Sequence, residues 1–377
     1  EAAIDQGMDA PLQDRLRLDR ARIADIADAL DAVAELPEVV GEVVEERTLY
    51  NGIELTRVRV PLGVVAMVYE ARPNVTADAA GLALKTANAC ILRGGSAAAH
   101  TNMAMTSVLA EAAEAAGMPK GCIQQVQGGH EATSELMGLR GLVDVLIPRG
   151  GAGLIRNVVD NAKVPVIETG VGNCHVYVHE SADMKKAVPI IMNAKTQRPG
   201  VCNAIESLLV DRAIADAALP PIVDALTGAG VRVHLDPECF SDGVLQAPVS
   251  DALSDEQRAL VVSASDEDWG TESLDLEISC KLVSGVQEAI DHVNRYGTGH
   301  SECIVAQDKE ACARFQQQVD AAVVYANAST RFTDGGEFGL GAEIGISTQK
   351  LHARGPMGLV ALTSTKYELT GEGQIRG

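Results

Sequence analysis

The chain has 377 residues, of which 46% are hydrophobic, 22% charged and 3% aromatic, and it carries a formal net charge of −21 with a pI near 4.7. This length exceeds an ordinary single domain, so we expect two or more packed units. The negative charge argues against a nucleic acid or an anionic membrane surface as partner, and no apolar run is long enough to span a bilayer.

The first predicted element is a helix over residues 12–36, where Leu and Ile recur every three to four residues among Asp and Arg. After Pro37, polar and apolar residues alternate on both sides of Asn51-Gly52, a dipeptide that favours a two-residue hairpin turn. Residues 42–60 are therefore predicted to form a β-hairpin. It is too polar to be a core pair, so we expect it to join another sheet; an exposed hairpin on a monomer is the alternative.

From Gly63 onward, short apolar strands alternate with Ala-rich helices, which predicts a parallel sheet covered on both faces, the general form of a dinucleotide-binding domain. In this first unit we expect strands at 64–69, 90–93, 124–127, 143–148 and 166–168, and helices at 75–87, 103–116, 131–138 and 153–160. A second α/β unit is predicted from about Gly172. There we expect strands at 175–179, 207–210, 231–234, 277–284, 303–307 and 322–327, and helices at 184–194, 286–294 and 311–319.

Cys202 carries the strongest chemical signal, because it follows a Pro199-Gly200 corner and two cations, Lys195 and Arg198. The corner predicts that Cys202 stands at or near the start of a new element, where unpaired backbone N–H groups and the cations favour the thiolate. The same amides can hold the oxyanion that forms when a thiolate attacks an acyl group. The alternative is a buried apolar cysteine.

The other cysteines and the histidines give no sign of a metal. The eight cysteines form no C-x-x-C pair, and the eight histidines lack ligand spacing apart from His175 and His179, which are too far apart on a predicted strand to chelate easily. We interpret the histidines as structural or surface residues. We expect no metal site, no disulfide framework and a reducing, cytoplasmic location.

Six ordered segments carry a resemblance that covers nearly the whole chain. They are VPLGVVAMVYEARPN at 60–74, LRGGS at 92–96, VIETGVGNCH at 166–175, NAKTQRPGVCNAIESLLV at 193–210, NRYGTGH at 294–300 and FGLGAEIGIS at 338–347. These segments resemble the gamma-glutamyl phosphate reductase family of the aldehyde dehydrogenase superfamily. That family has further helical sequence before the position matched by Glu1.

The resemblance implies an α/β, aldehyde dehydrogenase-like fold with a Rossmann-like cofactor domain, an α/β catalytic domain and a small β oligomerisation element. We expect the NADP(H)-binding domain over 1–41 and 61–171 and the catalytic domain over 172–356. The oligomerisation element would combine the hairpin at 42–60 with residues 357–377. In the superfamily such a ribbon reaches a neighbouring subunit and pairs with the terminal strand.

The resemblance also implies NADPH-dependent reduction of L-glutamyl 5-phosphate to L-glutamate 5-semialdehyde and phosphate, a step of proline biosynthesis. Cys202 would attack the acyl phosphate, and hydride would then pass to the thioester carbonyl. A homo-oligomer is expected, with glutamate 5-kinase as a further candidate partner. Two alternatives stay open: a hydrolytic aldehyde dehydrogenase, and an inactive scaffold partner of glutamate 5-kinase.

Five residues are candidates for catalysis or substrate binding. Asn74 approximately matches the superfamily's oxyanion-hole asparagine, and Glu168 matches the glutamate that activates water in hydrolytic members. Because hydrolysis would waste the acyl group, Glu168 is interpreted as positional or as a proton shuttle, with a structural carboxylate as the alternative. Lys195, Arg198 and Arg331 are candidates for binding the substrate's carboxylate or phosphate; ordinary ion pairs are the alternative for the arginines.

One glycine turn is a candidate for the cofactor phosphates. Arg149, Gly150, Gly151 and Gly153 follow a predicted strand and open a predicted helix, a context in which glycines let the backbone approach a pyrophosphate. A simple tight turn is the alternative. Glu272 approximates the superfamily glutamate that holds the nicotinamide ribose.

A second glycine turn bears on the choice of cofactor. Arg93, Gly94, Gly95 and Ser96 end another predicted strand, where the superfamily commonly keeps a lysine on the adenosine ribose. An arginine with a nearby serine suits a 2′-phosphate, which favours NADP(H) over NAD(H). The alternative is a surface arginine.

Overall fold

The computed structural model describes residues 16–70 and 73–376, so the start of the predicted helix at 12–36 lies outside the described residues. The chain divides into two compact units, one drawn from residues 1–169 and 335–377 and the other from residues 170–334. The division falls close to the predicted border at 171. Residues 335–356, which were expected in the catalytic domain, group with the first unit. They do so because Ile344 and Ala353 pack into the core of that unit.

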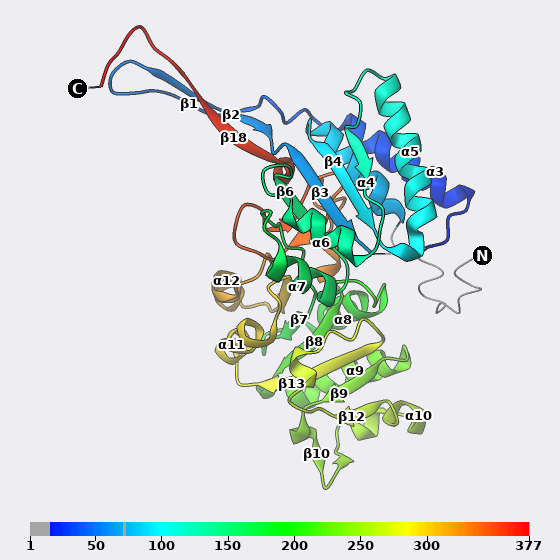
Figure 1. The fold of residues 1–377 in the computed structure, drawn as a ribbon. Helices are drawn as coiled ribbons and strands as arrows, with labels where there is room; N and C mark the ends of the chain where they lie inside the picture. The colour runs from blue at the N-terminus through cyan, green and yellow to red at the C-terminus, as the bar shows by residue number, and fades with distance from the viewer. Residues whose placement is uncertain (1–15, 71–72, 377) are drawn as a thin grey trace. The chain divides into compact units, whose positions relative to one another are not determined.

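The first unit is built on a four-stranded parallel sheet in the order β5-β4-β3-β6 (Figure 1). Its strands are β3 (Val64–Tyr69), β4 (Ala89–Gly94), β5 (Ile123–Gln125) and β6 (Val145–Arg149). Its helices are α3 (Arg20–Glu35), α4 (Pro73–Lys85), α5 (Ala99–Ala115), α6 (His130–Gly138) and α7 (Ala152–Asn161). The expected strand at 166–168 is wrong, because this segment forms only an isolated bridge between Leu146 and Val166.

Strand β3 shows why this sheet is buried on both faces. Val65, Met67 and Tyr69 pack with side chains of α3, α4 and α5, whereas Ala66 and Val68 pack with side chains of α6 and α7. Alternate residues of a strand point to opposite faces, so a continuous apolar run requires cover on both sides.

The second unit contains a seven-stranded parallel sheet in the order β12-β9-β13-β8-β7-β14-β15. Its strands are β7 (Cys174–Val178), β8 (Ile205–Asp211), β9 (Arg232–Leu235), β12 (Val261–Ser263), β13 (Glu277–Val283), β14 (Ser301–Val305) and β15 (Val323–Ala326). Its helices are α8 (Met184–Thr196), α9 (Ala215–Gly228), α10 (Asp255–Arg258), α11 (Val286–Tyr296) and α12 (Lys309–Gln318). Two short strands, β10 (Phe240–Ser241) and β11 (Val244–Leu245), form a small ribbon.

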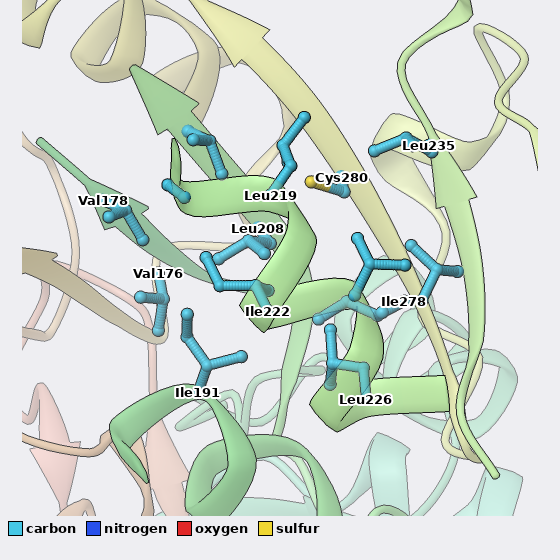
Figure 2. Close-up of a cluster of buried hydrophobic side chains, with 14 of the residues drawn as sticks. Val176, Val178, Ile191, Leu208, Leu219, Ile222, Leu226, Leu235, Ile278 and Cys280 are labelled. Atoms are coloured by element: carbon cyan, nitrogen blue, oxygen red, sulfur yellow. The ribbon is translucent and has the colours of Figure 1, made fainter. Parts of the chain in front are cut away.

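Helix α9 was not predicted, because it contains Pro220 and Pro221, which disfavour a helix interior. Its apolar face compensates by packing on the sheet, as Figure 2 shows for Leu219, Ile222 and Leu226. Tertiary packing of an apolar face contributes more to a helix in a protein than local propensity does.

A separate antiparallel sheet in the first unit has the order β1-β2-β18, with β1 (Val43–Thr48), β2 (Glu54–Pro61) and β18 (Thr363–Thr370). The predicted hairpin is confirmed, and Gly52 in its turn has φ of 83°. Strand β18 runs beside the hairpin in Figure 1 and pairs with β2 of the same chain. Within the segment 357–377, which was predicted to hold the terminal strand, a short 3-10 helix over Leu359–Leu362 precedes β18.

The sheet of the first unit brings three strand ends to one edge. Tyr69 pairs with Gly94 on one side and with Arg149 on the other. The turns after β3, β4 and β6 therefore meet at the carboxyl edge, where α/β sheets commonly bind ligands. Among the described residues, no helix is both long enough and apolar enough to cross a membrane.

Candidate functional site

Cys202 lies in a turn between α8 and β8, three residues before Ile205 begins the strand, and its side chain is half-buried. The element that follows is a strand. Cys202 was expected at or near the start of an element, and it lies near the start of a strand but not in it. Because that element is a strand, it supplies no helix dipole to stabilise the thiolate. The turn lies at the amino edge of the parallel sheet, since β8 starts there.

The backbone of Cys202 is fixed by neighbouring segments of the second unit. Gly172 packs so closely that a Cβ built on it would lie 1.6 Å from the Cys202 carbonyl oxygen. The thiol of Cys174 donates to the same oxygen at 3.1 Å. The next residue, Asn203, donates from Nδ2 to the carbonyl oxygen of Thr333 at 2.9 Å. The thiol is therefore presented on a rigid turn, as a nucleophile requires.

Lys195 is buried and paired. Its Nζ lies 2.9 Å from Glu206 Oε2, and both side chains are almost completely shielded from solvent. The Glu206 carboxylate also accepts from the Ser273 hydroxyl at 2.6 Å and from the Leu274 N–H at 3.2 Å. Burial raises the pKa of Glu206 and lowers the pKa of Lys195, while their attraction opposes both shifts. The prediction that Lys195 contacts the substrate is corrected, because its ammonium is enclosed and occupied by Glu206.

Two arginines supply the positive charge around Cys202. Arg331 is half-buried, and its Nε donates to Gln197 Oε1 at 2.9 Å. Burial and the neighbouring Arg198 lower the pKa of Arg331, whereas Cys202 acts in the opposite direction. Arg198 is exposed. Because the guanidinium groups lie close enough to affect each other and Cys202, this part of the second unit attracts an anionic group.

Glu272 supports the same turn. Its Oε1 accepts the backbone N–H of Gly172 at 2.6 Å, and Gly172 in turn packs on Cys202. The carboxylate therefore helps to place the cysteine. If Glu272 holds the nicotinamide ribose, as the resemblance implies, it would do so with its other carboxylate oxygen, Oε2.

The glycine turn after β6 carries an unexpected carboxylate. Gly151 is the N-cap residue of α7, and its N–H donates to Glu70 Oε2 at 3.0 Å. A Cβ built on Gly150 would lie 2.8 Å from Glu70 Cδ, so the side chain of Glu70 lies directly over the turn. The turn was predicted to receive the cofactor phosphates, and a phosphate placed there would meet this negative charge.

Arg93 is buried, so the surface-arginine alternative is wrong. Its Nη2 donates to the carbonyl oxygens of Gly128 at 2.8 Å and Gly129 at 3.0 Å, and its Nη1 donates to the carbonyl oxygen of Gly94. Arg93 thereby joins the end of β4 to the loop before α6. Ser96 is exposed and begins the short 3-10 helix Ser96–Ala98.

Asn74 lies in the first turn of α4 and is exposed. Its Nδ2 donates to Asp78 Oδ2 at 3.2 Å. Burial raises the pKa of Asp78 to about 6, while the bond from Asn74 and the charge of Arg149 act in the opposite direction. Asn74, Asp78 and Arg149 thus form a polar cluster near the carboxyl edge of the first sheet.

Glu168 belongs to the same unit as Asn74. It is half-buried, and its backbone N–H donates to Gln349 Oε1 at 2.8 Å. The following residue, Thr169, donates from its hydroxyl to the carbonyl oxygen of Pro148 at 2.7 Å. These bonds fix the backbone of this segment next to the end of β6.

Three carboxylates described above were not predicted from the sequence: Glu70, Asp78 and Glu206. A signal for Asp78 was present, because Pro73 favours the first position of a helix and a helix that begins there places Asn74 and Asp78 on one face. The predicted helix began at residue 75, so this pair was not recognised.

Comparison with known proteins gives consistent matches. The model of the aldehyde dehydrogenase family matches residues 13–252. A gamma-glutamyl phosphate reductase of Thermoanaerobacter pseudethanolicus is 51% identical over 368 residues, covering 97% of this chain and 85% of the relative. One of Moorella thermoacetica is 53% identical over 379 residues, covering 100% of this chain and 86% of the relative.

A solved structure agrees with these matches. The crystal structure of the gamma-glutamyl phosphate reductase of Thermotoga maritima superposes with a TM-score of 0.93 at 46% identity, covering 100% of this chain and 87% of that chain. The expected aldehyde dehydrogenase-like α/β fold is therefore confirmed.

Proposed function

This chain belongs to the aldehyde dehydrogenase family and, within it, to the gamma-glutamyl phosphate reductases, and we propose that it reduces L-glutamyl 5-phosphate through a thioester on Cys202. The observation that carries the proposal is a half-buried cysteine on a rigid turn beside two guanidinium groups. The first unit would bind the cofactor, and the second would carry the nucleophile.

The chain's own residues account for the covalent steps. The Cys202 sulfur attacks the acyl carbon, the C–S bond forms, and the carbonyl oxygen takes the negative charge. The tetrahedral intermediate then collapses: the C=O bond re-forms and the bond between the acyl carbon and the phosphate oxygen breaks. Phosphate leaves, and the thioester remains on Cys202. The reduced nicotinamide cofactor, when bound, supplies the hydride. Breaking the C–S bond of the resulting thiohemiacetal releases L-glutamate 5-semialdehyde and restores the sulfur nucleophile.

Asn74 is proposed to donate to the oxyanion, and Arg198 and Arg331 to bind the substrate's anionic groups. Each arginine can contact a phosphate or a carboxylate with two parallel N–H bonds. Glu168 is proposed to be positional. If Glu168 acted as a general base, the water that it activates would hydrolyse the thioester, and the acyl group would not be reduced.

The decisive experiment measures oxidation of L-glutamate 5-semialdehyde, the reverse reaction, with and without inorganic phosphate. The thioester of a reductase is released by phosphate, so the rate should collapse when phosphate is left out. A hydrolytic aldehyde dehydrogenase would keep its rate without phosphate, and an inactive scaffold would show no rate in either case. Either of those results would overturn the proposal.

The choice of NADP(H) is proposed from Arg93 and Ser96 at the end of β4. Replacing Arg93 with Ala should weaken NADPH binding more than NADH binding by about 1.5–3 kcal/mol, the range of a charge-assisted hydrogen bond. Titration of both cofactors into the same variant measures the difference. Arg93→Ala also removes the contacts of Arg93 with the loop before α6, and that loss affects the binding of both cofactors. Only the difference between the losses for NADPH and NADH therefore measures the contact with the 2′-phosphate. Equal losses would place the discriminating residue elsewhere.

Glu70 should oppose cofactor binding, because its carboxylate covers the N-terminal turn of α7. We expect Glu70→Gln to tighten NADPH binding by about two- to fivefold, since one charge near a helix end contributes about 0.3–1 kcal/mol. Asp144→Asn is the matched control, because Asp144 also binds a backbone N–H, that of Val64 at 2.7 Å, at the start of β3. Weaker or unchanged binding in Glu70→Gln would mean that phosphates do not approach this carboxylate.

Members of the aldehyde dehydrogenase family are generally oligomers, and the sheet β1-β2-β18 is proposed as the contact between copies. Tyr367 and Leu369 on β18 are each 55% exposed. Replacing both with Lys should shift the sedimenting species to a smaller mass, because two charges would be buried against the partner. The control replaces Lys366 and Glu368, which alternate with them on the strand, by Ala. An unchanged mass in the double-Lys variant would contradict this assignment.

A cytoplasmic location is part of the same proposal, because the relatives are named for a biosynthetic enzyme. Contact with glutamate 5-kinase rests on the resemblance alone.

A further inference from the structure

We infer that Gln197 is a positioning residue that aims the guanidinium group of Arg331 at an anionic group of the substrate. The inference rests on the proposed reaction at Cys202, and it deepens the proposed role of Arg331. The contacts that carry it all lie within the second unit, residues 170–334.

The backbone of Arg331 is fixed to the residue that follows Cys202. Asn203 Nδ2 lies 2.9 Å from the carbonyl oxygen of Thr333 and 3.5 Å from that of Arg331. In return, the Thr330 hydroxyl donates to the carbonyl oxygen of Asn203 at 2.7 Å. Asn203 and Thr330 are buried, so these hydrogen bonds are shielded from competing water. The loop that carries Arg331 is therefore held against the nucleophile turn.

The guanidinium group is fixed separately, by the segment that precedes Cys202. Arg331 Nε donates to Gln197 Oε1 at 2.9 Å, and Gln197 is the C-cap residue of α8. This bond uses the single N–H of Nε. Among the described residues, the side chain of Arg331 forms no other hydrogen bond. Nη1 and Nη2 therefore remain, and this end of the guanidinium group can hold a phosphate or a carboxylate with two parallel bonds.

Because Gln197 is neutral, it orients Arg331 without cancelling its charge. Elsewhere in the same unit, Arg212 pairs with the Glu238 carboxylate, whereas no carboxylate among the described residues forms an ion pair with Arg331. Burial lowers the pKa of Arg331 more than the charge of Asp334 raises it, so the folded chain compensates this cation only in part. A bound anion would complete the compensation, as is expected of an arginine that binds substrate.

A double-mutant cycle on the whole enzyme tests the inference. The measured quantities are kcat and the KM values for phosphate and for L-glutamate 5-semialdehyde in the phosphate-dependent oxidation. Arg331→Ala should raise one of these KM values by about 10–100-fold, the range for losing charge-assisted hydrogen bonds. A rise for phosphate would place the phosphate group at Arg331, and a rise for the semialdehyde would place its carboxylate there.

Gln197→Met keeps the length of the side chain but removes the acceptor, and Gln197 is exposed, so folding should not change. The variant should raise the same KM value as Arg331→Ala by about 3–10-fold, because the guanidinium group becomes free to turn away. We expect kcat to change by less than about twofold. In the Arg331→Ala background, Gln197→Met should have no further effect, since Gln197 acts only through Arg331.

Gln287→Met is the matched control. Gln287 Oε1 also accepts a hydrogen bond from an arginine of the same unit, Arg314. It lies in the first turn of α11, after the carboxyl end of β13, whereas the Cys202 turn precedes the amino end of β8. The control variant should therefore leave kcat and both KM values unchanged.

Unchanged KM values in Gln197→Met would overturn the inference, as would an effect of Gln197→Met that persists in full in the Arg331→Ala background. Both results would leave the proposed reaction intact. Unchanged KM values in Arg331→Ala would overturn the inference together with the proposed role of Arg331. The proposed reaction itself is rejected by a different result, a rate of oxidation by the wild-type enzyme that does not depend on phosphate.

Discussion

Replacing Cys202 with Ala should lower the rate of semialdehyde formation by at least about 10⁴-fold, because the proposed reaction passes through a thioester on its sulfur. The folded state should change little, since the half-buried side chain is removed from a turn held mainly by backbone contacts and by Asn203. Thermal unfolding of the variant measures that second point. A variant that retains semialdehyde formation would contradict the covalent mechanism.

The same residue should be the first of the eight cysteines to react with iodoacetamide near neutral pH. Reactivity depends on exposure and on the thiolate fraction, and Cys202 combines partial exposure with two nearby guanidinium groups. Burial raises the pKa of five other thiols and so slows their labelling: Cys90 and Cys303 to about 12, Cys239 to about 11, and Cys174 and Cys280 well above the ordinary value.

Two thiols remain to be ranked against Cys202. Burial also raises the pKa of Cys312, and Cys122 is buried. Peptide mass spectrometry after brief treatment ranks all eight sites, and bound acyl phosphate should protect Cys202 by occupying the sulfur. Faster labelling at another cysteine would contradict the electrostatic part of the argument.

The second large effect concerns the buried ion pair of Lys195 and Glu206, which lie on either side of Cys202 in the sequence. Lys195→Met should lower the free energy of unfolding by about 3–5 kcal/mol, because it leaves the Glu206 carboxylate buried without its cation. Urea unfolding at neutral pH measures the loss. The double variant Lys195→Met with Glu206→Gln should recover most of it, since glutamine keeps partners in Ser273 and Leu274 without a charge.

The loss should also depend on pH. Removing Lys195 takes away the attraction that opposes the raised pKa of Glu206. A carboxyl group whose pKa is higher in the folded state than in the unfolded state destabilises the protein as pH rises through the folded pKa. The defect of Lys195→Met should therefore shrink in acid, where Glu206 takes up a proton. A defect that is small at neutral pH, or that grows in acid, would contradict a buried ionic pair.

Local patterns were sufficient for most of the fold. Strand β3 was predicted from its short apolar run, and the hairpin was predicted from polar/apolar alternation on both sides of Asn51-Gly52; both signals involve neighbouring residues. Helix α9 was missed because its stability comes from packing on the sheet rather than from its own sequence. Prediction therefore failed where distant segments, and not neighbours, determine the structure.

The site follows the same rule. The Cys202 turn was predictable from its Pro-Gly corner, but the buried ion pair of Lys195 with Glu206 was not. Glu206 lies on β8, and that carboxylate is completed by Ser273 and Leu274, which precede the neighbouring strand β13. Which strand lies next to β8 depends on the topology of the whole sheet. Lys195 therefore pairs with Glu206, and that carboxylate is in turn bound by Ser273 and Leu274, which lie 67 and 68 residues after it in the sequence.

The sheet β1-β2-β18 has a consequence for synthesis of the chain on the ribosome. Arg59 on β2 contacts Thr363 on β18, 304 residues later in the sequence. The ribosome adds about 5–20 residues per second, so β18 is synthesised roughly 15–60 s after β2. An unpaired strand edge invites pairing with other chains during such a delay, and charged side chains on the edge oppose it. We therefore expect Arg57 and Arg59, the charged side chains of β2, to oppose pairing with other chains until β18 has been synthesised.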